Sequence, residues 1–158
     1  MIRTYLIAAT SAAVLAVPII AFAQQGQLGT ADEAKAMLVK AAAAVKADRD
    51  LALGMFNKGE GGFRDRDLYP FCFRIRDGKQ VAGPVSVPIG TDQRTLKDPT
   101  TGKEIGQEIY AAAQKAEGQI TETSSYMFPK PGTTAPLVAK ISFVTRVGDL
   151  GCGVGYYK

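Results

Sequence analysis

The sequence contains residues that could bind a small molecule, but few that could catalyse a reaction. It has no histidine, and histidine is the commonest general base and zinc ligand. Its absence also removes every Ser-His and Cys-His nucleophile pair. Gly151, Gly153 and Gly155 do not form a nucleotide loop, because no helix follows them to bind a phosphate. We therefore expect a non-enzymatic protein that has no metal site and no cofactor.

A lysine within an apolar strand is the best candidate for ligand binding. Lys140 is the one charge in the run 137–144 (LVAKISFV), and the alternation over 137–147 predicts a strand. A small anion requires a cation on a rigid element, walled by aromatic side chains that exclude water. A lysine that faces solvent at a sheet edge would give the same pattern. The sequence leaves both alternatives open.

Aromatic residues and one arginine complete the predicted ligand site. Tyr69 and Tyr126 are the candidate hydrogen-bond donors, and Phe71 and Phe143 are the candidate walls. Arg74 is a second candidate cation, on the strand that carries Phe71. Aromatic strand residues are more often ordinary core. Arg74 shares its face with a second arginine, and at least one of the two is expected to face solvent.

The two cysteines, Cys72 and Cys152, are the only ones in the chain. Both lie in predicted strands that are distant in sequence but could be neighbours in a sheet. A disulfide between them would close a long loop and stabilise the domain by about 2–4 kcal/mol. Two buried free thiols, acting as small hydrophobic residues, are the alternative. The sequence does not decide between them.

The strands are predicted from alternation and turns. An aromatic strand over 68–76 and a second strand over 80–87 form a hairpin around Asp77-Gly78, and Pro84 places the second strand at a sheet edge. Three more strands are expected at 120–128, 137–147 and 150–157.

Two helices are expected to cover the sheet. The first spans 30–59, with Thr30 and Glu33 in capping-box spacing, and Asp48 predicts a break with its side chain in solvent. The second begins near 102, where Thr101 and Glu104 repeat that spacing, and ends near 118. The order of elements predicts an α+β domain with an antiparallel sheet of about five strands.

The N-terminus has the pattern of a secretory signal peptide. Arg3 precedes an apolar stretch over 6–22, and Ala21-Phe22-Ala23 is a cleavage pattern. We expect a signal peptide at 1–23, a flexible leader at 24–29 and one domain at 30–158, located in the periplasm and not membrane-spanning after cleavage. The formal net charge is only +4 and forms no basic stripe, so nucleic acid is not an expected partner.

Short pieces in a fixed order over 34–157 resemble the single-Cache family, the PAS-like sensory domains found outside the bacterial membrane. The pieces are Gly61-Gly62-Phe63, Asp67-Leu68-Tyr69-Pro70-Phe71, Asp77-Gly78, Val81-Ala82-Gly83-Pro84, Gly90, Lys97-Asp98-Pro99, Gly102-Lys103, Tyr126, Pro129, Lys140-Ile141-Ser142-Phe143-Val144 and Gly153-Val154-Gly155-Tyr156. The family often has His-Pro where this chain has Gly83-Pro84.

The resemblance implies a long N-terminal helix behind a central antiparallel sheet, with a small pocket on the other face. It also implies a periplasmic sensory function, and Lys140 matches a position that could face a small organic acid. Family domains usually continue into a membrane helix, whereas this chain stops at Lys158 and looks free-standing. A membrane-bound receptor or kinase is then the expected signalling partner. The alternative is a ligand-free interaction or structural module that reuses the fold.

Overall fold

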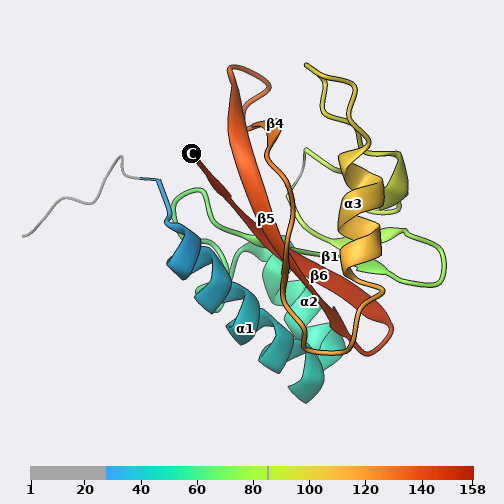
Figure 1. Cartoon of the computed structure of the whole chain (residues 1–158). Coiled ribbons are helices and arrows are strands. Elements are labelled where there is room, and N and C mark those ends of the chain that lie inside the picture. The colour runs from blue at the N-terminus through green and yellow to red at the C-terminus, as the bar shows by residue number, and fades with distance from the viewer. Residues whose placement is uncertain (1–27, 85) are drawn as a thin grey trace, which may run out of the picture.

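A single antiparallel sheet forms the centre of the molecule. The computed structural model describes residues 28–84 and 86–158. Within these residues the sheet has six strands in the order β2-β1-β6-β5-β3, and β4 pairs with β5 beside β3. Figure 1 shows α1 on one side of the sheet and α3 on the other. The predicted α+β architecture is confirmed.

The first predicted helix is two helices. α1 spans Ala31–Ala47 and begins with the expected Thr30–Glu33 capping box, and α2 spans Arg49–Lys58. Asp48 ends the first helix and caps the second, because its carboxylate accepts the Leu51 N–H at 3.0 Å. The predicted break is therefore present, and Asp48 is exposed. An N-cap aspartate is a common way to start a helix in a new direction.

The long hairpin of β5 (Leu137–Val147) and β6 (Leu150–Tyr157) has the predicted bounds. β1 (Pro70–Arg74) pairs with β6 on the side away from β5. β2 (Gln80–Ala82) is shorter than predicted and lies at the sheet edge. Gly78 has a φ of 72° in the turn between β1 and β2, a conformation that glycine adopts without strain.

The strand predicted over 120–128 is interrupted. It forms β3 (Thr121–Glu122) and β4 (Tyr126–Pro129), which both pair with β5. Thr123 lies between them and accepts the Ser142 N–H through its hydroxyl oxygen at 3.0 Å. This side-chain bond takes the place of a strand-to-strand bond. The interruption explains why the sheet has six strands and not five.

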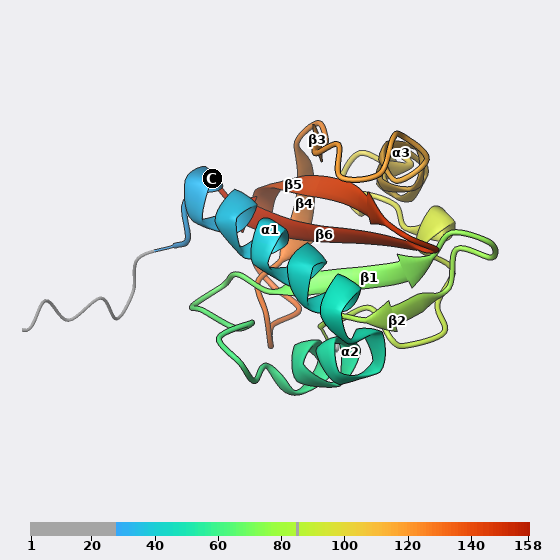
Figure 2. The same ribbon diagram turned by 90° about the horizontal axis from the view of Figure 1, so that it is seen from below.

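Helices cover both faces of the sheet. Figure 2 shows α1 lying across β6, and the hydrophobic core on this face includes Leu38, Phe143 and Val154. The other face is covered by α3 (Ile105–Ala112) and the short 3-10 helix η1 (Gln93–Thr95). The capping box predicted for α3 is absent, because its N-cap, Glu104, makes no side-chain cap bond.

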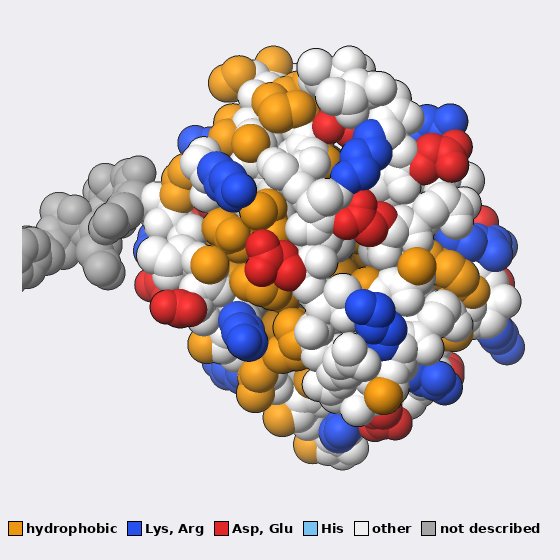
Figure 3. All heavy atoms as spheres, viewed as in Figure 1, with side chains coloured by type: hydrophobic (Ala, Val, Ile, Leu, Met, Phe, Trp, Pro, Cys, Tyr) orange, Lys and Arg blue, Asp and Glu red, His pale blue; other side chains and the backbone are white. Residues whose placement is uncertain are grey.

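The surface on the α1 side carries a band of hydrophobic side chains, with charged residues distributed around it (Figure 3). An apolar groove in this region is lined by Val39 and Ala43 of α1 and by Ile120 before β3. No helix among residues 28–84 and 86–158 is long and apolar enough to cross a membrane. The predicted signal peptide and most of the predicted leader lie outside the described residues.

The disulfide Cys72–Cys152 is formed, which settles the two alternatives left by the sequence. The two residues are direct partners in the β1–β6 ladder and are fully buried on the α1 face. The bond joins positions 80 residues apart. A cross-link of this span removes much of the conformational entropy of the unfolded chain.

Replacing both cysteines by alanine (Cys72→Ala with Cys152→Ala) is expected to lower the free energy of unfolding by about 2–5 kcal/mol. Urea denaturation of the wild type and the double variant measures the difference. Wild-type protein unfolded in a thiol reductant is the control, and it is expected to lose a similar amount. A loss below about 1 kcal/mol in both cases would show that the cross-link contributes little to stability.

Candidate functional site

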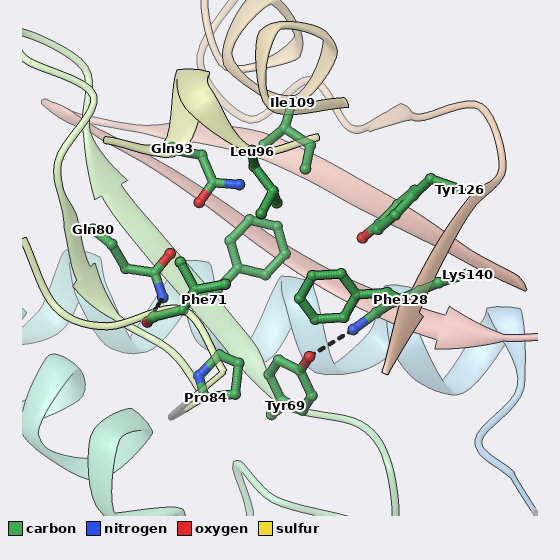
Figure 4. A pocket seen from close by; sticks show the side chains of 11 residues that line it. Tyr69, Phe71, Gln80, Pro84, Gln93, Leu96, Ile109, Tyr126, Phe128 and Lys140 are labelled. Atoms are coloured by element: carbon green, nitrogen blue, oxygen red, sulfur yellow. Dashed lines mark hydrogen bonds between the residues drawn. The ribbon is translucent and has the colours of Figure 1, made fainter. Parts of the chain in front are cut away.

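A narrow cavity lies between the sheet and the layer formed by η1 and α3. Its enclosed volume is only about 20 Å³. That volume holds about one water molecule, so a ligand of several atoms fits only if the walls move apart. It is lined by Tyr69, Phe71, Gln80, Pro84, Val87, Gln93, Leu96, Ile109, Tyr126, Phe128 and Lys140, most of which are labelled in Figure 4.

The ammonium group of Lys140 lies at one end of this cavity (Figure 4). The residue is only 2 % exposed. Its Nζ donates a hydrogen bond to Tyr69 Oη at 2.6 Å and a longer one to Tyr157 Oη at 3.4 Å. The rings of Tyr69, Phe128 and Tyr157 surround Nζ, with ring centroids at 4.4, 5.1 and 4.7 Å. The alternative of a solvent-facing lysine is excluded.

Glycines in β6 make room for the side chains that form the cavity floor. Gly155 pairs with Ser142 of β5, and a Cβ at Gly155 would collide with Cε of Lys140. A Cβ at Gly153 would likewise collide with the ring of Phe71. The missing side chains let Lys140 reach across β6 to Tyr69, which immediately precedes β1. Glycine in a strand interior often marks such a close approach.

No carboxylate among residues 28–84 and 86–158 forms an ion pair with Lys140. Burial lowers the pKa of its ammonium from 10.5 to about 7, and the charge of Asp67 opposes this change only in part. Asp67 is itself buried, and its Oδ1 accepts the Gly29 N–H at 2.6 Å. An ammonium group that is buried without a paired anion is costly. An anion placed in the cavity would remove much of that cost.

The tyrosines around Lys140 remain hydrogen-bond donors at neutral pH. Burial raises the pKa of the Tyr69 and Tyr126 hydroxyls, and it raises the pKa of Tyr157 to about 12. Tyr157 donates to the Pro129 carbonyl at 2.5 Å, and Tyr126 shares a hydrogen bond of 2.8 Å with Ser142. Tyr69 accepts from Lys140, and its hydroxyl also interacts with the hydroxyl of Tyr157. Lys140, with the Tyr69 hydroxyl beside it, can bind a carboxylate.

The structure brings together Tyr69, Phe71, Tyr126 and Lys140, four of the six predicted ligand residues. Phe143 was predicted to line the site, but it lies on the α1 face and stacks on Tyr156. It is three positions from Lys140 on a strand whose side chains alternate between the two faces. Arg74, the sixth predicted residue, also lies outside the cavity.

Arg74 does not line the cavity, because its guanidinium pairs with Asp77 at 2.9 Å in the β1–β2 turn. That hydrogen bond lowers the pKa of Asp77 and raises the pKa of Arg74. The charge of Arg74 is therefore paired with that of Asp77 within the turn.

Several residues of the cavity were not predicted. Gln80 begins β2, whereas Gln93 and Leu96 lie in and just after η1, outside every predicted helix and strand. Tyr157, which lies against the Lys140 ammonium, was also not predicted. Gln80 and Gln93 come together through long-range pairing, since residues 78–80 and 90–93 are joined by backbone hydrogen bonds. No local pattern in the sequence signals that pairing. No cluster of three or more residues suited to hold a metal ion occurs in the described part of the chain.

No protein-family model matches the chain, and no curated protein sequence matches it. Solved structures do. A methyl-accepting chemotaxis protein from Vibrio parahaemolyticus RIMD 2210633 is 20 % identical, covers 80 % of this chain and 86 % of that chain, and has a TM-score of 0.61.

Two further structures match. A Cache chemosensory domain, described for carboxylic acid recognition, is 21 % identical, covers 78 % and 84 % of the two chains, and has a TM-score of 0.53. The periplasmic sensor domain of a chemotaxis protein is 23 % identical, covers 80 % and 88 %, and has a TM-score of 0.55. The fold of this chain is therefore the Cache fold.

Replacing Gly155 by alanine is expected to lower the free energy of unfolding by about 1–3 kcal/mol, because the new methyl group would collide with Lys140. Gly54→Ala is the matched control. Gly54 lies inside α2 with nothing near its Cβ position, so alanine there is expected to stabilise by about 0.5–1 kcal/mol. Urea denaturation measures both. An equal, small effect of the two substitutions would contradict the close approach.

Lys140→Met is expected to stabilise the ligand-free protein most strongly below pH 7. There the lysine is protonated in both states, and the cost of burying its charge is fully present. Between about pH 7 and 10.5 the folded state loses the proton first, so the stability of the wild type rises with pH. The advantage of methionine should therefore shrink towards pH 10.5. Denaturation curves over this range measure it, and an advantage independent of pH would refute a buried charge.

Proposed function

We propose that this chain, which has the fold of the Cache chemosensory domains, is a periplasmic sensory domain that binds a small organic acid. The observation that carries the proposal is the buried ammonium of Lys140 at the end of a cavity, with no paired carboxylate among the described residues. The carboxylate of a ligand supplies the missing anion. Its oxygens accept from Lys140 and from Tyr69.

The size and walls of the cavity narrow the ligand class. Phe71, Leu96, Ile109 and Phe128 give it an apolar middle, and only a few atoms fit without movement of the walls. A short carbon chain satisfies both conditions, since apolar walls discriminate by shape and size. The solved Cache domain described for carboxylic acid recognition supports the same ligand class.

A periplasmic location is supported by two independent observations. The Cys72–Cys152 disulfide is typical of proteins in oxidising compartments, and one solved structure of the same fold is a periplasmic sensor domain. A binding event there alters cell behaviour only if it is relayed inward. We therefore also propose a membrane-bound receptor or kinase as the partner, in line with the chemotaxis proteins that share the fold.

Isothermal titration calorimetry with formate, acetate, propionate, butyrate, lactate and pyruvate tests the binding proposal. At least one acid is expected to bind the wild type. Lys140→Met is expected to weaken that binding ten-fold to a hundred-fold, which corresponds to the loss of a charge-assisted hydrogen bond. Lys35→Met, on the exposed side of α1, is the matched control and should bind like the wild type.

The absence of binding to any of these acids would favour the alternative, a ligand-free interaction module. Full binding by Lys140→Met would place the ligand elsewhere. Differential scanning fluorimetry with each acid gives an independent measure, because a ligand that binds only the folded state raises the melting temperature.

A further inference from the structure

The cavity has a second polar end, which the carboxylate proposal does not use. Gln80 and Gln93 lie opposite Lys140, with the apolar side chains of Phe71, Leu96 and Ile109 between the two ends (Figure 4). Gln80 is 1 % exposed and Gln93 is 2 % exposed. Two buried carboxamides at the end of an apolar cavity require hydrogen-bond partners.

The backbone holds the two glutamines in place. Gln93 N donates to Gly78 O and Gln80 N donates to Thr91 O, both at 2.8 Å, so the segment 90–93 runs beside the start of β2. α3 packs directly on this segment, because a Cβ at Gly106 would collide with the carbonyl of Gln93. The arrangement is therefore a built part of the cavity wall.

One carboxamide oxygen at this end has no partner. Gln80 Nε2 donates to Val87 O at 2.9 Å, which fixes the orientation of its carboxamide. Gln93 Oε1 is buried and accepts no hydrogen bond from the described residues. Figure 4 shows the two carboxamide groups facing each other at the cavity wall. Leaving a buried acceptor unpaired is costly, so a water molecule or a ligand that donates a hydrogen bond is stabilised there.

We propose that the ligand carries a hydroxyl group at the end opposite its carboxylate, and that Gln93, with Gln80 beside it, binds this hydroxyl. A hydroxyl both donates and accepts, as the Gln93 carboxamide does. A second carboxylate is disfavoured, because its oxygens cannot donate to Gln93 Oε1. This inference rests on the proposed function, since it names the class of acid that the same site prefers: short hydroxy acids with the hydroxyl at the far end.

Calorimetry on the wild type with matched pairs of acids is the first test. The pairs are propionate with 3-hydroxypropionate and butyrate with 4-hydroxybutyrate, and succinate is added as a dicarboxylate. We expect the hydroxy acid of the fitting length to bind at least ten-fold more tightly than its plain partner, because a site built for a hydroxyl rejects an analogue that lacks it. Succinate should bind more weakly than that hydroxy acid.

Gln93→Met provides the second test. Methionine has a similar length and no acceptor for this hydrogen bond, so the preference for the hydroxy acid should fall to about one-fold, while the plain acid binds as well as before or better. Gln107→Met, an exposed position on α3, is the matched control and should keep the preference. Circular dichroism verifies folding, and Gln93→Leu replaces the methionine variant if that variant does not fold.

Plain acids that bind the wild type as tightly as their hydroxy partners would overturn this inference and leave the proposed function standing. A preference that survives in Gln93→Met would also overturn it. If no acid of either kind binds, the proposed function fails and the inference fails with it.

Discussion

The burial of the Lys140 ammonium is the constraint on which the rest of the site depends. A charge taken out of water without a counter-ion costs several kcal/mol even after the protein relaxes. Three aromatic rings and two tyrosine hydroxyls offset part of that cost. The remainder is reflected in the lowered pKa of the lysine. A domain with no use for this charge would be more stable with an apolar residue there.

The sheet is arranged so that this side chain can reach its place. Lys140 belongs to β5, but Tyr69, which accepts its shorter hydrogen bond, precedes β1 on the far side of β6. Gly155 leaves the space that the side chain needs to cross β6. On the opposite face, the Cys72–Cys152 disulfide joins β1 to β6 within the core under α1. The face that carries the cavity can therefore keep a partly unpaired polar interior, because the other face is tightly packed and cross-linked.

Local patterns in the sequence predicted the elements well and the assembled site only in part. The bounds of β5 and β6 follow from strict alternation and a Gly-Asp turn, and Lys140 was recognised because it interrupts an apolar strand. Phe143 was predicted as a wall of the site, although the alternation of the strand places it on the face opposite Lys140. Gln80 and Gln93 were missed because their proximity depends on pairing between a turn and an irregular segment. Such pairing is a property of the whole fold, and a single sequence does not display it.

Carbon-13 NMR of the Lys140 side chain, recorded as a function of pH with and without the best-binding acid, tests the central claim most directly. The assignment comes from comparison with Lys140→Met. The pKa of Lys140 in the ligand-free protein is expected to be about 7. Saturation with the acid should raise this pKa, because the bound carboxylate favours the charged form of the lysine. An ordinary pKa near 10.5 in the free protein, or no change when the acid is bound, would contradict an ammonium group that is buried to receive an anion.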